Sequence, residues 1–257
     1  MTRSTAALVG ATGGAGTTRL AVELGATLAR DGREVAVLDA DFATEGLARH
    51  CSGRIDPDMT ALLVEERPLA DGLGEHPATA DLAGRLELCP ARAPFERLAR
   101  AKTADAAQRF ESLLAEAASR FDHVLVDAPP VAANQAVAAV TGAQRVAVVA
   151  PASERGVDAV QRTRGRVADV GARVDAVVAN RAGPDHPLRS ADAAVPTCNS
   201  SAVADAPASA PDPEATFAPA VAHAAEVVFD AELGVEFEEP GLFDFDAGEL
   251  LPDALSE

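Results

Sequence analysis

The sequence predicts an α/β fold, in which a doubly wound, mostly parallel sheet carries helices on both faces. Short apolar and β-branched runs alternate with longer amphipathic segments as far as residue 180. Most of the short runs are continuous stretches of apolar residues, so we expect strands that are buried on both sides. A glycine-rich turn joins the first predicted strand to the first predicted helix, as in many ligand-binding members of this fold class.

Most of the predicted strands end where an aspartate, a proline or a glycine turn interrupts the apolar run. The second strand ends at Asp39, the third at Pro90 and the fifth at Pro151. Such residues end a strand because they add charge or remove a backbone N–H. The predicted strands are Ala6–Val9, Val35–Leu38, Leu86–Cys89, His123–Asp127, Val146–Ala150 and Val174–Asn180.

The amphipathic segments between these strands predict helices. Residues from Thr18 to Arg30 place leucines on one helical face and stop at Asp31-Gly32. A long helix that contains Phe110 and Leu114 precedes the fourth strand, and a last helix is expected from Phe217 to Leu233. Strands separated by helices need crossover connections, which predicts the parallel pairing.

The rest of the sequence indicates one domain followed by a tail. We expect a single domain over residues 1–233, in which residues 182–216 form a long surface loop rich in Ala, Ser, Asp and Pro. One short strand is expected in that loop, before Pro196. Residues 234–257 contain many carboxylates and no basic residue, which is typical of a flexible acidic tail.

Composition narrows the classes of function. The 257 residues carry a formal net charge of −18, and Lys102 is the only lysine. A negative net charge opposes binding to nucleic acid or anionic lipid. The acidic, lysine-poor composition resembles that of proteins from salt-accumulating organisms. A GC-rich genome, which favours Arg and Ala codons, is the alternative explanation. Neither a long apolar run nor a secretory leader is evident, so we expect a cytoplasmic protein. The isolated Cys51, Cys89 and Cys198 indicate reduced thiols rather than a metal cage.

The most informative segment runs from Gly10 to Arg19 and reads GATGGAGTTR. A glycine loop between a strand and a helix can direct several backbone N–H groups, and the positive end of the helix dipole, at a phosphate. Glycine permits the positive φ angles and the close approach of the anion that such a turn requires. A tight strand-to-helix turn without a ligand is the simpler alternative.

One interpretation of the loop is a dinucleotide site. The glycines from Gly10 to Gly16 are spaced as in short-chain dehydrogenases, and Asp39 or Asp41 follows where a cofactor ribose is held in such folds. That family places its proton chemistry on a tyrosine and a lysine four residues apart, whereas this chain has no tyrosine. Nicotinamide redox chemistry of that kind is therefore excluded, but an NAD(P)-binding protein without it stays open.

A second interpretation accounts for more of the chain. The run from Thr12 to Thr18 resembles the deviant Walker A loop, K-G-G-x-G-K-[ST], of the MinD/ParA family of P-loop ATPases. Further segments match in order, and the resemblance covers roughly residues 4 to 233. They are Val37–Asp41, similar to that family's D-x-D, Leu88–Ala91, the Walker B-like Phe121–Pro130, Val149–Glu154 and Val178–Arg181. The resemblance implies a three-layer P-loop NTPase fold.

The same resemblance implies a site for ATP or ADP with Mg²⁺. It places Mg²⁺ on Thr18 and Asp127, with Asp39 near its ligand shell. Asp41 would position the attacking water, and Asn180 would contact the adenine. As alternatives, Thr18, Asp39 and Asp41 only begin or cap helices, and Asn180 only ends a strand. The expected phosphate-binding residues are Gly13, Gly14, Ala15, Gly16, Thr17 and Thr18.

Both lysines of the family's loop are missing. Thr12 replaces the signature lysine and Thr17 the lysine that neutralises the β- and γ-phosphates. Since phosphoryl transfer depends on positive charge at those oxygens, we expect a pseudo-ATPase. Arg3 and Arg19 are not expected to restore catalysis, and Lys102 is expected on a surface helix. The loss at Thr12 also weakens the case for the family's face-to-face homodimer across ATP.

The sequence therefore predicts a MinD/ParA-like nucleotide-binding switch or scaffold with weak or no ATP hydrolysis. The family-level role is the positioning of cellular cargo at a division site, a chromosome or surface machinery, with a protein partner that the sequence does not name. Three alternatives stay open: an active ATPase with substituted lysines, a protein-interaction scaffold without nucleotide, and the NAD(P)-binding protein described above.

Overall fold

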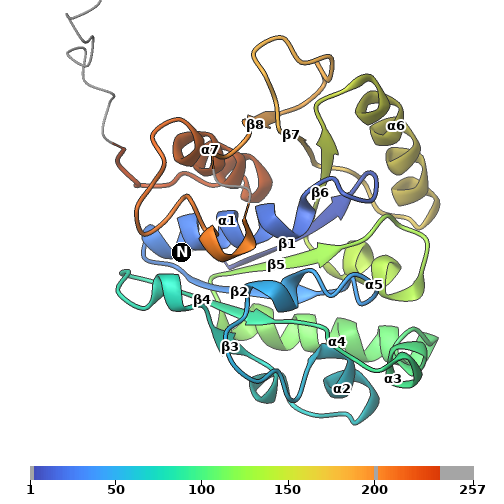
Figure 1. The fold of residues 1–257 in the computed structure, drawn as a ribbon. Coiled ribbons are helices and arrows are strands. Elements are labelled where there is room, and N and C mark those ends of the chain that lie inside the picture. Colours follow the sequence, from blue (N-terminus) through green and yellow to red (C-terminus); the bar gives the residue numbers. More distant parts are fainter. Residues whose placement is uncertain (1–2, 200–201, 238–257) are drawn as a thin grey trace, which may run out of the picture.

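A computed structural model describes residues 3–199 and 202–237 of the chain (Figure 1). Eight strands form one sheet in the order β3-β4-β2-β5-β1-β6-β7-β8, and every neighbouring pair is parallel except β3 with β4. The predicted doubly wound, mostly parallel sheet is confirmed. The strands are β1 Ser4–Gly10, β2 Glu34–Asp39, β3 Gly74–Glu75, β4 Arg85–Cys89, β5 His123–Ala128, β6 Arg145–Pro151, β7 Ala176–Asn180 and β8 Ala193–Val195.

Helices cover both faces of the sheet, as Figure 1 shows. Helices α1 and α7 pack on one face, where they meet Ala6 and Leu8 of β1. On the other face, α2, α4 and α5 pack with Ala7 and Val9 of the same strand, and α6 covers β6 and β7. The helices are α1 Thr17–Arg30, α2 Met59–Val64, α3 Phe95–Arg100, α4 Ala104–Arg120, α5 Asn134–Gly142, α6 Glu154–Asp169 and α7 Phe217–Phe229, with short 3-10 turns at Leu47–His50, Leu69–Asp71, Pro77–Thr79 and Val203–Asp205.

Helix α1 illustrates why the sequence folds in this way. Its leucines Leu20, Leu24 and Leu28 recur every four residues, and all three are buried against the sheet. The helix begins directly after Gly16, whose φ of 86° lies in the left-handed region. Its amino end therefore lies at the carboxyl edge of the sheet, where the glycine loop leaves β1.

Several local elements differ from the sequence-based prediction. The helix α2 and the two-residue strand β3 were not expected, because each is too short to establish a period. The last helix ends at Phe229 rather than Leu233, since Asp230 takes a positive φ of 52°. Lys102 lies in the turn between α3 and α4 instead of on a helix. The short strand predicted before Pro196 is confirmed as β8.

The strand order separates this fold from the common dinucleotide-binding sheet. In that sheet the first two strands are neighbours, whereas here β5 lies between β1 and β2. The NAD(P)-binding alternative is therefore not supported by the topology. Asp39 at the end of β2 is the register neighbour of Asp127 in β5, so two carboxylates meet at the edge where the glycine loop begins.

The structure describes only residues 234–237 of the predicted acidic tail. Residues 238–257, most of the acidic tail, lie outside the described residues. In the described part of the chain, no helix combines the length and the apolar character that crossing a bilayer requires.

Candidate functional site

Among the described residues, no side chain accepts a hydrogen bond from the backbone N–H groups at the start of α1, where the loop from β1 ends. Gly14 and Gly16 have φ angles of 74° and 86°, and the cap position of α1 makes no side-chain hydrogen bond. The first N–H groups of a helix have no partner inside the helix, and they carry the positive end of its dipole. The start of α1 is therefore suited to an anion.

Residues at the end of β7 hold this loop in shape. The Asn180 side-chain amide donates to the Ala15 carbonyl at 2.8 Å, and Arg181 donates through Nη1 to the Gly14 carbonyl at 3.2 Å. Because a trans peptide points its C=O and N–H in opposite directions, the bond to Ala15 turns the Gly16 N–H away from Asn180. A Cβ at Gly16 would lie 2.4 Å from Asn180 Nδ2, which explains why glycine is needed there.

Two hollows adjoin the loop. The first has a volume of about 280 Å³ and is lined by residues 12–18, by Asp41 and Thr44 after β2, and by Asp127 with the residues that follow β5. The second, of about 190 Å³, is lined by Arg19, Asn180 and the segment 196–198. Gly16 and Arg181 line both hollows, so the two adjoin at these residues.

Asp127 is the most perturbed carboxyl group at the edge of the first hollow. The residue is 1% exposed, and its Oδ2 atom has no hydrogen-bond partner among the described residues. Burial raises the pKa of Asp127 to about 7, the Thr18 hydroxyl opposes this shift, and the nearby Asp41 charge adds to it. A buried oxygen without a partner that borders a hollow is an available ligand for a cation or a donor.

Asp39 and Asp41 differ from Asp127 in their surroundings. Asp39 is fully buried, and its two oxygens accept backbone N–H groups of Asp41 and Ala91 at 2.8 and 3.0 Å. Burial, and then the charge of Asp127, raise the pKa of Asp39 well above its usual range. Asp41 is only half-buried, lines the hollow and accepts a hydrogen bond from Thr44 Oγ1 at 2.9 Å. Asp41 is thus placed to act on a molecule in the hollow, whereas Asp39 supports the backbone around it.

Neither of the two threonines that replace the family's lysines brings a positive charge to the hollow. Thr12 lines the hollow, and Thr17 is buried against Gly10, where an added Cβ would lie 2.9 Å from Thr17 Oγ1. Arg19 Nε donates to buried Glu23 at 2.6 Å, and Arg19 lines the adjoining hollow of about 190 Å³ rather than this one. Neither Arg3, which donates to the Ser119 carbonyl, nor the lysine between α3 and α4 lines this hollow.

The sequence matches the model of one protein family over most of its length. The family model of the AAA domain matches residues 4–176, which include the glycine loop and both carboxylate-bearing strand ends. The chain belongs to the AAA domain family. A comparison with curated proteins finds no match.

Solved structures place this AAA domain chain in the MinD-like fold. MinD of Pyrococcus horikoshii in complex with Mg-ADP is 19% identical, with a TM-score of 0.74 over 88% of this chain and 95% of that chain. The ATP complex of a Cyanothece McdA variant is 20% identical, with a TM-score of 0.59 over 73% and 75%. Cobyrinic acid a,c-diamide synthase of Mycobacterium smegmatis, with an ATP analogue and magnesium, is 20% identical, with a TM-score of 0.58 over 71% and 74%.

These matches confirm the resemblance to the MinD/ParA family and the three-layer P-loop fold that the motifs predict. Sequence reasoning did not find how Asn180 and Arg181 hold the loop. The only signal was their position directly after a predicted strand. Which strand ends beside the loop is decided by the order of strands in the sheet.

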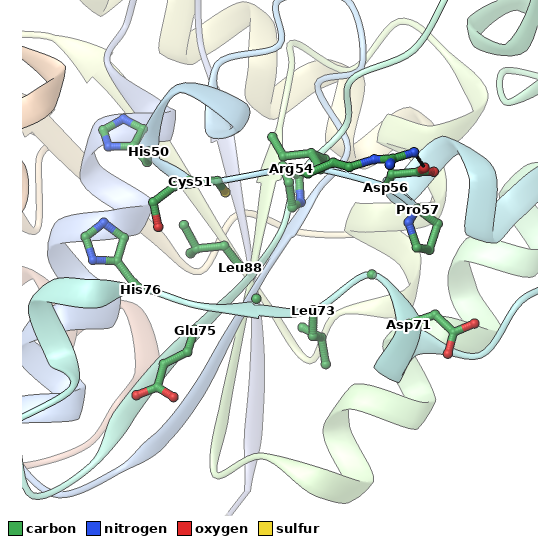
Figure 2. Close-up of a pocket in the computed structure, with 15 residues that line it drawn as sticks. His50, Cys51, Arg54, Asp56, Pro57, Asp71, Leu73, Glu75, His76 and Leu88 are labelled. Atoms are coloured by element: carbon green, nitrogen blue, oxygen red, sulfur yellow. Dashed lines mark hydrogen bonds and ion pairs between the residues drawn. The ribbon is translucent and has the colours of Figure 1, made fainter.

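A third hollow of the AAA domain chain lies away from the glycine loop. Figure 2 shows His50 and His76 near one end of it, with Asp56 and Asp71 toward the other. Its volume is about 100 Å³. Burial lowers the pKa of His50 to about 4 and also lowers that of His76, so both rings are neutral at pH 7. Within residues 3–199 and 202–237, no cluster of three or more His, Cys, Asp or Glu side chains has the arrangement to hold a metal ion.

Proposed function

We propose that this chain is a nucleotide-binding switch or scaffold of the MinD/ParA type, which binds ADP or ATP with Mg²⁺ and hydrolyses ATP weakly or not at all. One observation carries the proposal: a hollow of about 280 Å³ combines a glycine loop, the start of a helix and a buried carboxylate, but no lysine. Similar folds hold Mg-ADP in MinD and an ATP analogue with magnesium in the diamide synthase.

The residues around the hollow fit a magnesium nucleotide. Thr18 and Asp127 offer oxygen ligands, and the Oδ2 atom of Asp127 is buried without a partner. Mg²⁺ favours a site with one or two protein ligands, several waters and the phosphates of a substrate. When bound, the ion would neutralise phosphate charge.

Each remaining residue has a defined role in the proposal. The backbone from Gly13 to Thr18 donates to phosphate oxygens, and Asp41 orients a water molecule in the hollow. Asp39 keeps the end of β2 in place through its two backbone hydrogen bonds. Asn180 lines the adjoining hollow of about 190 Å³, which is where the base would lie.

Weak hydrolysis follows from the charges that are missing. In phosphoryl transfer the protein mainly positions cations against oxygens that gain charge in the transition state. Threonines at positions 12 and 17 provide no cation, and Arg19 is paired with Glu23. By analogy with the loss of an arginine finger, the rate should fall by about three to five orders of magnitude.

Isothermal titration calorimetry with ATP, ADP and NAD, in Mg²⁺ and high salt, tests the proposal together with a phosphate-release assay. We expect heat from ATP and ADP and no measurable turnover. Turnover at the rate of an active ATPase would show that other groups replace the lysines. Heat from NAD alone, or from none of the three, would reject the proposal in favour of a dinucleotide protein or a scaffold without nucleotide.

The double variant Thr12→Lys, Thr17→Lys is the complementary experiment. If only the two ammonium groups are missing, the variant should release phosphate from ATP, and Asp41→Asn in the same background should abolish that release. The cellular role that we propose is positioning of cargo such as a division site, a chromosome or surface machinery. The similarity to MinD and McdA supports that role, which needs a protein partner outside this chain.

A further inference from the structure

Arg181 is the one basic residue that lines the 280 Å³ hollow in the described part of the chain. Its side chain is exposed and forms no ion pair with another described residue. Since a guanidinium remains protonated at all physiological pH values, Arg181 keeps a full positive charge beside the loop.

The backbone directs this side chain toward the loop. Arg181 has a φ of 57°, in the left-handed region that residues other than glycine seldom occupy. Its N–H donates to the Asn180 Oδ1 atom at 2.9 Å, which stabilises the turn immediately after β7. From this turn, Nη1 reaches the Gly14 carbonyl at 3.2 Å. Nη2 lies on the same side of the loop, 3.4 Å from where a Cβ of Gly16 would be.

The position of the guanidinium indicates which part of a ligand it meets. Gly16 and Arg181 border both the phosphate-sized hollow and the adjoining hollow at Asn180. A nucleotide that spans the two hollows would place its α- and β-phosphates where the hollows adjoin, at Gly16 and Arg181. Its γ-phosphate would lie deeper in the 280 Å³ hollow, toward Asp41 and Asp127. The guanidinium carries five N–H donors, of which one is used by Gly14, so donors remain for phosphate oxygens.

We infer that Arg181 is the phosphate-binding cation of this site and that it recognises the diphosphate shared by ADP and ATP. The inference rests on the proposed nucleotide binding. It explains how a loop without lysine retains affinity while hydrolysis is lost, because the charge is supplied at the diphosphate and not at the γ-phosphate. ADP and ATP should therefore bind with similar affinity, and a nucleoside without phosphates should bind much more weakly.

The test uses the full chain and three variants. Arg181→Gln removes the charge, Arg181→Lys keeps it without the planar fork, and Arg189→Gln is the matched control, because Arg189 is exposed and lines neither hollow. Dissociation constants for ADP, ATP and adenosine are measured by calorimetry in Mg²⁺, and thermal unfolding checks that each variant is folded. Arg181→Gln should weaken ADP and ATP about ten- to hundredfold and leave adenosine unchanged.

Three further results complete the test. Arg181→Lys should recover most of the ADP affinity, and Arg189→Gln should match the wild type. Equal affinity of wild type and Arg181→Gln for ADP would overturn the inference while the proposed function stands. Equal losses for ADP and adenosine would also overturn it, since the guanidinium would then act on the base or on loop shape. A wild type that binds no nucleotide would reject both proposals.

Discussion

Single residues at the carboxyl edge of the sheet set the properties of this site. Gly16 combines a positive φ with the close approach of Asn180, and Asp127 is buried with one oxygen that has no partner. Gly165, which lies in helix α6 away from the loop, has open space where a side chain would go and no positive φ. The three positions therefore predict different responses to substitution.

Gly16→Ala should remove nucleotide binding. Its Cβ would lie 2.4 Å from Asn180 Nδ2, and the left-handed backbone adds strain of about 1 to 3 kcal/mol. We expect ADP affinity below detection in calorimetry and a lower midpoint of thermal unfolding. Gly165→Ala, at an exposed position of α6, is the control and should leave the ADP affinity unchanged without lowering the midpoint of thermal unfolding. Equal effects of the two substitutions would show that the loop is not held by Asn180 in solution.

Asp127→Asn should change how stability depends on pH. The pKa of Asp127 is raised from 3.8 to about 7 in the folded state, so the folded protein holds this proton more tightly than the unfolded chain. The resulting stability is fully present below pH ~4 and is lost as pH rises toward ~7, at about 1.4 kcal/mol per pKa unit. Relative to Asp127→Asn, the wild type should become less stable over this range.

The measurement is urea unfolding of the nucleotide-free proteins between pH 4 and 8, in the presence of a chelator. Taking the difference between wild type and variant removes the contribution of the histidines, which titrate in both proteins. Asp212→Asn, at an exposed position, provides the control for loss of a carboxylate from the surface. A difference that does not vary with pH would contradict the raised pKa.

At the scale of elements, buried Glu23 ties helix α1 to the distant segment around Ser209. Its carboxylate accepts the backbone N–H groups of Ala208 and Ser209, the Ser209 hydroxyl and Arg19 Nε, at 2.6 to 3.0 Å. The side chain has no exposed surface. This network holds the long connection before α7 against α1, and it occupies the Nε atom of Arg19.

Glu23→Ala should lower the free energy of unfolding by about 3 to 5 kcal/mol, because it removes one partner of a buried ion pair and leaves several donors unsatisfied. Urea denaturation measures this change. Glu96→Ala, on an exposed part of α3, is the control and should stay within about 0.5 kcal/mol of the wild type. A loss for Glu23→Ala as small as that of the control would show that water replaces the network without cost.

At the scale of the whole molecule, oligomeric state depends on what replaces the signature lysine. By resemblance, that lysine reaches the nucleotide of a partner subunit across a face-to-face dimer, and here Thr12 takes its place at the rim of the hollow. A threonine side chain is shorter than a lysine side chain and carries no charge, so Thr12 cannot make the same contact. The net charge of −18 adds repulsion between two copies at low ionic strength.

We therefore expect no ATP-dependent dimer of the wild type. Sedimentation velocity with and without Mg-ATP, at high salt to screen repulsion, should give the same molar mass. Thr12→Lys, which restores the ammonium, should increase the dimer fraction with ATP. A wild-type mass that doubles on addition of ATP would contradict the expectation and assign the contact to other residues.

The sequence was sufficient for the α/β class and for the positions of most strands. The apolar runs that end in Asp39 and Asp127 predicted strands and their carboxyl edge, because both signals are local and short in range. Two short elements, β3 and α2, escaped prediction because their lengths of 2 and 6 residues carry no usable period. The start of the last helix at Phe217 was predicted correctly, but its end was missed because the left-handed turn at Asp230 has no glycine to mark it.

By itself, the sequence determined the α/β class, the glycine loop and the absence of lysine from it, since these follow from residue type and spacing. Only the tertiary structure decided that Asn180 and Arg181, more than 160 residues away, hold the loop, and that Arg19 does not serve it. The physical reason is strand order: which strand ends lie side by side depends on packing across the whole sheet, and no local pattern encodes it.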